Sequence, residues 1–374
     1  MIKLLIADDS ALMRKYLGEI FMDEGDFEVC IARNGAEALS LARSFAPDVI
    51  TLDVNMPEMD GITCLSRIMV ECPKPVVMVS SLTSEGAEVT LQALALGAVD
   101  FISKPDGTVS LHIGQIKAML VAKVRAAAKA RLRTSRGLLE RVRYHAGTVA
   151  AQKAGVAPKP WPAAGGRSAN GAAAGASGGA ALGAARGAVL IGVSTGGPGA
   201  IEAVIPRLPK DFPWPILIAQ HMPESFTGVF ARRIDGLSQL NVIEVTRPEP
   251  LRDGMVYIGR GDADLVIGNR GGVLTAIPMP ASARHIWHPS VERLVTSALD
   301  HLAPDRLLGV LLTGMGDDGA VAMAELRGRG GRTIAESEET AVVWGMPGEL
   351  VKRNGASIVL PLQRIAEQIR RWSN

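Results

Sequence analysis

The 374-residue sequence has few cysteines, no long apolar run and almost no net charge. Its three cysteines, Cys30, Cys64 and Cys72, are odd in number and lack metal-ligand spacing, which argues against a disulfide framework and for a reducing compartment. No apolar stretch approaches the roughly 18 residues that span a bilayer, which argues against a membrane protein. A net charge of +2 neither favours nor excludes an acidic partner. We therefore expect a cytoplasmic globular protein whose function is set by local groups of residues.

One segment in the middle of the chain has almost no side chain that could enter a core. Of the 43 residues from 146 to 188, 27 are Ala or Gly, so burial cannot compensate for the entropy lost on ordering. Residues 117–143 carry nine Lys or Arg and one acidic residue, and a solvated basic helix is favoured there over a docking surface. The sequence therefore predicts domains at 1–122 and 186–374, joined at 123–185 by a basic helical extension and a flexible linker.

Short apolar stretches alternate with amphipathic helical patterns in the first domain. The helical patterns are SALMRKYLGEIF (10–21) and GAEALSLARSF (35–45). The stretches expected to form strands are LLIA (4–7), VCIA (29–32), DVITLD (48–53), PVVMVS (75–80) and VDFIS (99–103). This alternation predicts an α/β fold in which helices cover both faces of a parallel sheet.

Polar side chains stand where these predicted strands end. Asp8 and Asp9 follow the first strand, Asp53 ends the third, Ser80 ends the fourth and Lys104 follows the fifth. Because ligands of parallel sheets bind at this edge, we expect the carboxylates to meet there and to bind Mg²⁺, which prefers oxygen ligands. Asp53 is then placed to attack a phosphoryl group, while Lys104 and the metal neutralise its charge. Any one aspartate alone is more simply a helix cap or a turn cap, but the combination favours a phosphoryl-transfer site.

Residues 1 to about 122 resemble response-regulator receiver domains, through the stretches LLIADDSALMRK, LDVNMPEMDG, VVMVSSLT and GAVDFISKP. The resemblance implies a flavodoxin-like fold with Asp53 as the phosphoacceptor. The Mg²⁺ ligands that it implies are Asp8, Asp9, Asp53 and the backbone carbonyl of Asn55. It further implies that Lys104 contacts the phosphoryl group, that Ser80 is the switch hydroxyl, and that Phe101 is the aromatic that moves with it.

In the second domain, three chemically distinct groups follow apolar strands. AVLIGV leads into Ser194, WPILIAQ leads into His221, and LLGVLLT leads into a GMGDDG loop that contains Asp317 and Asp318. In a doubly wound sheet, such strand ends can converge on one crevice. The glycine-rich stretch VLIGVSTGGPGA also suggests a phosphate-binding loop, but no Lys or hydroxyl follows its glycines. The sequence therefore favours a serine nucleophile.

The chemistry then suggests roles for these groups. A serine hydroxyl is a weak nucleophile until a base removes its proton, and His221 titrates in the required range. An acid would orient the imidazole, but spacing alone does not decide between Asp317 and Asp318. The order Ser, His, Asp along the chain differs from that of α/β-hydrolases, so the G-x-S-x-G match around Ser194 does not indicate that fold.

Two further features of this domain concern backbone donors and histidines. Backbone N–H groups that follow Ser194, beginning with Thr195, and those around Met315 are candidates for an oxyanion hole. His285 and His288 form an H-x-x-H pair, but no third ligand is evident nearby, so a metal site there is the weaker interpretation.

Residues 186–374 resemble the catalytic domain of chemotaxis protein-glutamate methylesterases, through IGVSTGGP, IAQHMPESFT, LLTGMGDDGA, HPSVERL and AESEETAVVWGMPGEL. The resemblance implies a Rossmann-like parallel α/β domain without a cofactor. The triad that it implies is Ser194, His221 and Asp318, with the N–H of Met315 as a candidate oxyanion donor. Two departures from the family pattern lie near the expected substrate groove: His288 stands where an arginine is usual, and IGRGDADL lacks its usual histidine.

The paired resemblances imply a phosphorylation-activated enzyme that hydrolyses glutamate methyl esters on chemoreceptors and deamidates receptor glutamines. The implied partners are methyl-accepting chemoreceptors and a chemotaxis histidine kinase, and we expect a monomer peripheral to receptor arrays. We also expect the unphosphorylated receiver to shield the crevice. The alternatives are a receiver-controlled hydrolase of small esters or peptides and a non-enzymatic regulator. A nucleic-acid partner is not expected, because nothing resembles a helix-turn-helix beside a basic face.

Overall fold

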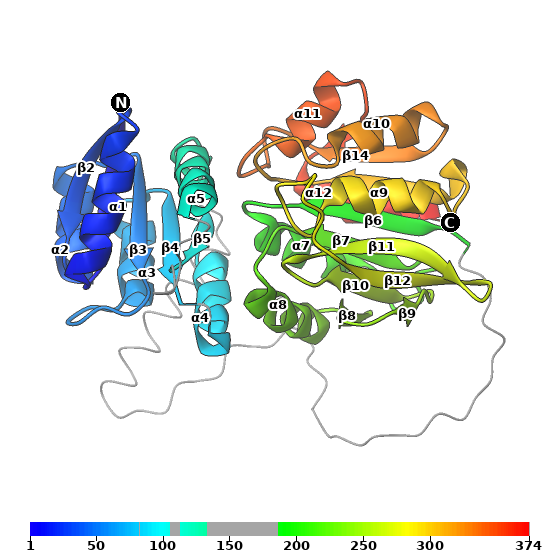
Figure 1. Cartoon of the computed structure of the whole chain (residues 1–374), viewed down its shortest axis with the longest axis horizontal. Helices are drawn as coiled ribbons and strands as arrows, with labels where there is room; N and C mark the ends of the chain where they lie inside the picture. The colour runs from blue at the N-terminus through cyan, green and yellow to red at the C-terminus, as the bar shows by residue number, and fades with distance from the viewer. Residues whose placement is uncertain (82, 105–112, 133–185, 374) are drawn as a thin grey trace, which may run out of the picture. The chain divides into compact units, whose positions relative to one another are not determined.

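The computed structural model describes residues 1–81, 83–104, 113–132 and 186–373. The chain divides into two compact units, Met1–Pro162 and Ala163–Asn374 (Figure 1). Most of the predicted linker lies outside the described residues, so its flexibility stays a prediction. Within the described part of the chain, no helix is both long and apolar enough to cross a membrane.

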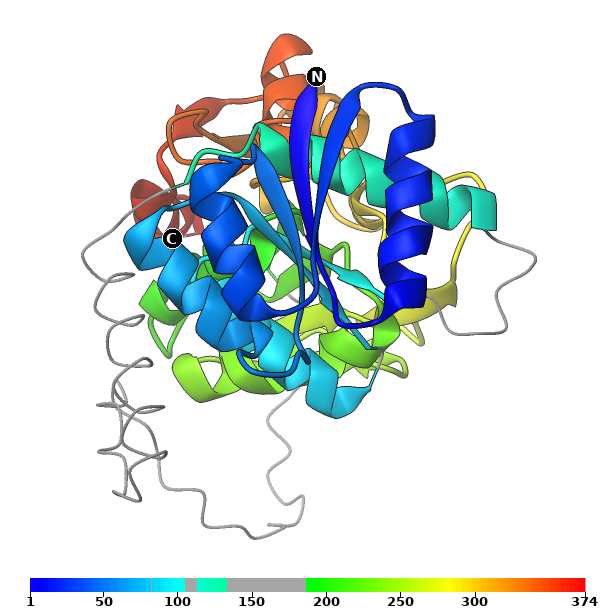
Figure 2. The same ribbon diagram turned by 90° about the vertical axis from the view of Figure 1, so that its left-hand side faces the viewer.

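The amino-terminal unit is built on a five-stranded parallel sheet in the order β2-β1-β3-β4-β5 (Figure 2). Its strands are β1 (Ile2–Ala7), β2 (Phe27–Ala32), β3 (Val49–Asp53), β4 (Val76–Ser80) and β5 (Asp100–Ser103). Every residue of β3 and β4 is buried, as continuous apolar sequence predicts for central strands. The strand order reverses between β1 and β3, so the carboxyl ends of these two strands flank the usual ligand crevice. The predicted strands of this unit are confirmed.

Helices cover both faces of this sheet. They are α1 (Ala11–Asp23), α2 (Gly35–Ser44), α3 (Gly61–Glu71), α4 (Ser84–Ala95) and α5 (Ile113–Ala128). α1 and α5 lie together on one face, and α2, α3 and α4 lie on the other (Figure 2). Ser10 caps α1, because its side chain accepts the backbone N–H of Met13. Asp9 is therefore not the residue that caps this helix.

The carboxy-terminal unit contains a seven-stranded parallel sheet in the order β15-β14-β13-β6-β7-β10-β8. Its strands are β6 (Ala188–Val193), β7 (Ile216–Gln220), β8 (Asn241–Val245), β10 (Met255–Gly259), β13 (Leu307–Leu311), β14 (Arg332–Glu336) and β15 (Ile358–Leu360). β6 lies in the middle of the sheet, with β7 on one side and β13 on the other. The carboxyl ends of these three strands therefore meet where the strand order reverses.

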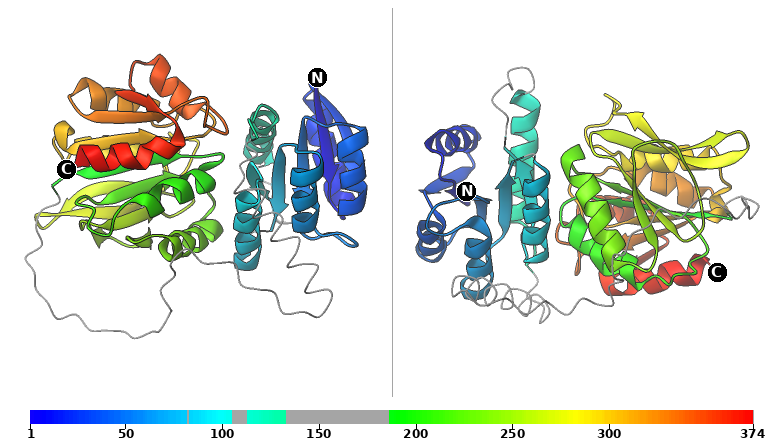
Figure 3. Two further views of the ribbon diagram at one scale, coloured as in Figure 1. Left: turned by 180° about the vertical axis from the view of Figure 1, so that it is seen from behind. Right: turned by 90° about the horizontal axis from the view of Figure 1, so that it is seen from below.

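Helices also cover both faces of this second sheet, which confirms the doubly wound architecture. One face carries α7 (Gly197–Val204), α8 (Glu224–Leu237) and α12 (Leu362–Ser373). The other face carries α9 (Val291–Leu299), α10 (Ala320–Gly328) and α11 (Met346–Lys352). Figure 3 shows α12 running along its face of the sheet. Apolar side chains from β6, β13, α9 and α10 form one continuous core cluster beneath the loops that carry the candidate site.

A three-stranded antiparallel sheet in this unit is a feature that the strand–helix alternation does not predict. It joins β9 (Glu249–Pro250), β11 (Ala263–Arg270) and β12 (Val273–Pro280) in the order β11-β12-β9. Gly271 and Gly272 form the turn between β11 and β12, with φ angles of 60° and 85° as a tight hairpin requires. This Gly-Gly pair is the signal that could have predicted the hairpin. β11 packs against α9, beside the candidate site.

Candidate active site

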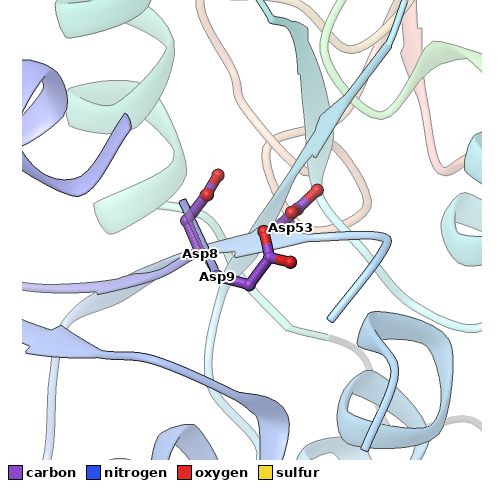
Figure 4. A group of neighbouring side chains, drawn as sticks. All are labelled: Asp8, Asp9 and Asp53. Carbon is purple, nitrogen blue, oxygen red and sulfur yellow. The ribbon is translucent and has the colours of Figure 1, made fainter. Parts of the chain in front are cut away.

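An acidic cluster lies at the carboxyl edge of the first sheet (Figure 4). Asp8 and Asp9 follow β1 directly, and Asp53 is the last residue of β3. One carboxylate oxygen from each of the three lies within 4.8 Å of the others. Asp8 and Asp53 are buried and Asp9 is exposed. The structure therefore brings together the three side chains that the strand-end pattern predicted.

Lys104 joins this cluster from the loop after β5. Its ammonium lies 2.8 Å from Asp53 Oδ2 and 3.1 Å from Asp8 Oδ2. Burial would lower the pKa of Lys104, but its hydrogen bond to Asp53 and the two negative charges outweigh this and raise it. Lys104 therefore stays charged and compensates part of the negative charge of the cluster.

The donor atoms of the cluster fit a hard cation such as Mg²⁺. Asp8 Oδ2 is buried beside the Lys104 ammonium, 3.1 Å away, and a carboxylate oxygen has lone pairs enough to bind a metal ion as well. Asn55 lies beside the cluster, since its backbone N–H is 3.4 Å from Asp53 Oδ1. The cluster offers carboxylate oxygens and a backbone carbonyl oxygen as ligands. Because Asp9 is exposed to solvent, there is also room for the water ligands that Mg²⁺ retains.

The two predicted switch residues lie on the neighbouring strands rather than in the cluster. Ser80, at the end of β4, donates its hydroxyl hydrogen to the carbonyl oxygen of Gly86 in α4 at 3.3 Å. Phe101, on β5, is buried, and the Lys123 ammonium lies 5.1 Å from its ring centre. Their roles as switch residues stay predictions.

In the second unit, Ser194 stands in a tight turn between β6 and α7. Its N–H donates to the Thr313 carbonyl at 3.0 Å, and its own carbonyl accepts from the Gly197 N–H at 2.8 Å and from Gln220 Nε2 at 3.1 Å. Gly196 has a φ of 78°, and a Cβ on Gly197 would lie 2.0 Å from Gln220 Oε1. The two glycines are therefore required for the turn that holds Ser194 at the sheet edge.

His221 follows β7, and its ring binds an aspartate from the loop after β13. His221 Nε2 lies 2.8 Å from Asp318 Oδ2. The other ring nitrogen, Nδ1, is buried and has no hydrogen-bond partner among the described residues. The backbone N–H of His221 donates to the carbonyl of Val193, the residue before Ser194, at 3.1 Å. Asp318 therefore holds Nε2 as the protonated nitrogen, which leaves Nδ1 to act as a base, on a residue whose backbone adjoins the Ser194 turn.

Asp318 is held at the start of α9. Its oxygens accept the backbone N–H groups of Val291 (2.8 Å) and Glu292 (3.1 Å) and the hydroxyl of Ser290 (3.1 Å), as well as His221. Burial alone would raise the pKa of Asp318, but the His221 hydrogen bond and charge and the two backbone donors outweigh it and hold the pKa below its ordinary value. Asp318 is therefore a fixed carboxylate.

The structure distinguishes the two aspartates that spacing left open. The side chain of Asp317 is 67% exposed and lies 3.9 Å from Arg353, whereas Asp318 binds His221. The loop before them lies against the serine, since a Cβ on Gly314 would lie 2.7 Å from Ser194 Cβ. Met315 follows directly, and its backbone N–H donates no hydrogen bond to the described residues.

The other predicted residues have different contacts. Thr195 is buried, and its carbonyl accepts the Thr313 hydroxyl at 2.9 Å. His288 Nδ1 lies 2.8 Å from Asp264 Oδ1, so this histidine of the H-x-x-H pair has a carboxylate partner.

Comparison with known proteins gives the two units their families. The model of the response regulator receiver domain matches residues 4–113, and that of the CheB methylesterase matches residues 189–369. The chain is 58% identical over 373 residues to "Protein-glutamate methylesterase/protein-glutamine glutaminase 3" of Rhodospirillum rubrum, an alignment that covers 100% of this chain and 96% of the relative. This chain belongs to the protein-glutamate methylesterase/protein-glutamine glutaminase family.

Another relative and one solved structure are also similar to this chain. A second glutamate methylesterase/glutaminase, from Rhodopseudomonas palustris, is 54% identical and covers 100% of this chain and 99% of its own length. The crystal structure of the Thermotoga maritima CheB methylesterase catalytic domain is 37% identical, with a TM-score of 0.48, and covers 50% of this chain and 97% of its own. The predicted pairing of a receiver domain with a methylesterase domain, which is a hydrolase, is confirmed. A receiver domain in turn implies phosphorylation with Mg²⁺.

Two buried residues of the methylesterase domain contact the site but were not predicted from the sequence. Gln220 Nε2 donates to the carbonyl oxygens of both Ser194 and His221, each at 3.1 Å, and so links the backbones of the two. Glu336 is fully buried and accepts the Thr313 N–H at 2.8 Å, on the same residue whose carbonyl binds Ser194. Both are polar residues at the end of an apolar strand, and that is the signal that could have found them.

Proposed function

We propose that this protein is a receiver-controlled serine hydrolase that removes methyl groups from glutamate methyl esters of chemoreceptors and deamidates receptor glutamines. The observation that carries the proposal is the His221–Asp318 pair: Nδ1 of His221 has no partner among the described residues, and the backbone of His221 binds the strand end that leads into Ser194. The names of the relatives supply the substrate class, glutamate methyl esters and glutamines of a protein.

In the first chemical step, His221 Nδ1 accepts the Ser194 hydroxyl proton while Oγ attacks the ester carbonyl carbon. Asp318 stabilises the imidazolium that forms, and its four hydrogen bonds keep it in place. The oxyanion of the tetrahedral intermediate is stabilised by backbone N–H groups, for which Met315 is the first candidate and Thr195 the second.

Collapse of that intermediate releases methanol, which takes the proton from His221 and leaves an acyl-enzyme on Ser194. Water then attacks the acyl carbon, His221 again accepts and returns one proton, and glutamate is released with the free serine. A glutamine side chain follows the same route with ammonia as the leaving group. One site therefore serves both reactions.

For the receiver domain we propose Asp53 as the phosphoacceptor, with Asp8, Asp9 and the Asn55 carbonyl holding Mg²⁺. When bound, the metal neutralises charge on the transferred phosphoryl oxygens, and Lys104 contacts the phosphoryl group. Ser80 and Phe101 are proposed to follow the change as switch residues.

The remaining assignments concern the setting of the reaction. We propose a chemotaxis histidine kinase as the phosphodonor, methyl-accepting chemoreceptors as substrates, and a cytoplasmic monomer at the periphery of receptor arrays. Domain boundaries of 1–122, 123–185 and 186–374 are supported by the family matches at 4–113 and 189–369.

The proposal is tested by methanol release from methylated receptor membranes, measured with and without Mg²⁺ and a small phosphodonor. Ser194→Ala is expected to abolish release, and Ser238→Ala, at the distant end of α8, is the matched control with wild-type release. Release from Ser194→Ala at the wild-type rate would disprove the serine mechanism. If wild type releases no methanol from receptors but hydrolyses small esters, the alternative hydrolase is the better interpretation.

A further inference from the structure

Residues 282–290, which we call the flap, lie between β12 and α9, and both ends of the flap bind one buried carboxylate. Asp264 Oδ2 accepts the backbone N–H of Ser282 at 3.1 Å, and Oδ1 accepts the backbone N–H of Ser290 at 2.7 Å. The same carboxylate binds His288 Nδ1 at 2.8 Å and Arg293 at 2.5 Å. The side chain of Asp264 has no solvent exposure, so within the described part of the chain these bonds take the place of water around its charge. The flap is therefore anchored at both ends to β11.

Within the flap, the indole of Trp287 lies over the catalytic imidazole. The ring centres of Trp287 and His221 are 5.6 Å apart and their planes differ by 14°, an offset-stacked arrangement. The indole also reaches the loop that follows β13, because a Cβ on Gly316 would lie 3.7 Å from Trp287 Nε1. Trp287 therefore lies beside the base and beside the loop that carries Met315.

His221 needs such a contact because its ring is held by a single hydrogen bond. Asp318 binds Nε2, while Nδ1 has no partner among the described residues. A ring that is attached at Cγ and hydrogen-bonded at Nε2 can still rotate about the axis through these two atoms, and such a rotation changes the direction in which Nδ1 points. A flat surface parallel to the ring removes this freedom.

We propose that Trp287 is a positioning residue for His221, and that Asp264 holds in place the flap that carries it. The inference rests on the proposed serine mechanism and deepens it. It also gives a role to His288 and to the loop around Asp264, the two places where the sequence departs from the family pattern.

The test uses the full-length protein and an alkyl fluorophosphonate, which reacts with activated serines and needs no receptor. Reaction forms a bond between Ser194 Oγ and phosphorus, releases fluoride and transfers the hydroxyl proton to His221. Trp287→Ala is expected to lower the maximal labelling rate about three- to tenfold, as loss of one aromatic stack implies, with the half-saturating probe concentration unchanged. Trp287→Phe keeps a flat ring and should restore most of the rate.

The matched control is Trp372→Ala on α12. Trp372 is also half-buried and also stacked, with the Arg332 guanidinium 5.7 Å from its ring centre, but on a helix that carries no site residue. It is expected to label at the wild-type rate. Asp264→Asn should lower the rate by a factor similar to that of Trp287→Ala, and the double variant should fall no further, because both changes act through one contact.

The outcomes separate this inference from the proposed function. No labelling of wild type, or equal labelling of Ser194→Ala, would overturn the serine mechanism and this inference with it. Labelling of Ser194 in wild type together with an unchanged rate in Trp287→Ala would overturn the inference alone. The same holds if Trp287→Phe is as slow as Trp287→Ala, or if Trp372→Ala is equally slow. Thermal unfolding of each variant distinguishes a local effect from a loss of folded protein.

Discussion

The two sites of this protein occupy equivalent places in their sheets but balance negative charge in different ways. In the receiver domain, three carboxylates have oxygens within 4.8 Å of one another, and the Lys104 ammonium binds two of them, those of Asp8 and Asp53. In the methylesterase domain, the one carboxylate of Asp318 has four hydrogen-bond donors, two of them backbone N–H groups at the start of α9. The first site therefore has more carboxylates than the Lys104 ammonium can neutralise, whereas the Asp318 carboxylate has a hydrogen-bond donor on every side that the described residues provide.

This difference corresponds to what each site has to do. When a cation or a phosphoryl group binds to a cluster with uncompensated charge, the charge and the contacts of the cluster change. A regulatory domain transmits such a change to the domain that it controls. A carboxylate surrounded by fixed donors keeps its geometry through the reaction, so that stabilisation is present before charge develops. Substitutions at either site test this difference, and the largest effect is expected at the methylesterase site.

The largest effect is expected when the fixed carboxylate is changed. Asp318→Asn places an amide opposite donors that need an acceptor and favours the wrong tautomer of His221, so the maximal rate of methanol release should fall about 10³- to 10⁴-fold. Asp317→Asn is the matched control, because its side chain is 67% exposed and does not bind His221. An equal loss in both variants would show that the loop, rather than the Asp318 carboxylate, carries the effect.

The next effect concerns control by the receiver domain. Asp53→Asn removes the nucleophile for phosphorylation, so activation by a small phosphodonor should be lost. A hundredfold activation would require only about 2.7 kcal/mol of differential stabilisation. Asp23→Asn, at the exposed end of α1, should respond like wild type. A normal phosphodonor response in Asp53→Asn would rule out Asp53 as the phosphoacceptor.

How far these sites could be predicted depends on the distance along the chain over which each interaction acts. The acidic cluster was predictable, because Asp8, Asp9 and Asp53 each mark the end of an apolar strand and a parallel sheet brings such ends together. The Ser194 turn was also predictable, because Ser194 follows an apolar strand and the glycines that form the turn lie directly beside it in the sequence.

The donors to Asp318 were not predictable from local pattern. Ser290, Val291 and Glu292 reach Asp318 only because α9 packs beside the loop after β13, a placement that no local signal encodes. The stacking of Trp287 on His221 depends on the same placement, because the flap leads into α9. In this protein, the site residues at the strand ends could be predicted from the sequence. The residues that hold those side chains in place could not, because tertiary packing alone brings them to the site.

A smaller effect is expected from Mg²⁺ at the acidic cluster. Binding to the folded receiver domain relieves repulsion among the carboxylates, so a saturating Mg²⁺ concentration should stabilise this domain by about 2 kcal/mol relative to EDTA. The readout is the thermal unfolding transition of the receiver domain. Asp9→Asn should reduce this gain and Asp23→Asn should retain it. An unchanged gain in Asp9→Asn would mean that Mg²⁺ acts elsewhere.

The smallest effect is expected from the titration of Glu292, a carboxyl group close to Asp318. Its size shows whether the negative charge around Asp318 is fully balanced. Burial, together with the negative charge of Asp318, raises the pKa of Glu292 from an ordinary 4.5 to about 7. The folded protein therefore holds this proton more tightly than the unfolded chain does, so Glu292 makes the free energy of unfolding fall as the pH rises from 4.5 to about 7. Because Glu292 is partly exposed, we expect this loss to be about 1 kcal/mol.

Glu292→Gln removes the titration but keeps an oxygen that can accept the Gly319 N–H, which Glu292 binds at 3.0 Å. In denaturant unfolding, this variant should match wild type at pH 4 and exceed its stability at pH 8 by about 1 kcal/mol. Glu325→Gln, whose side chain is 55% exposed on α10, is the control and should follow the wild-type curve. If Glu292→Gln also follows the wild-type curve, ionisation of Glu292 does not destabilise the folded protein. The negative charges of Asp318 and Glu292 would then be compensated by their surroundings.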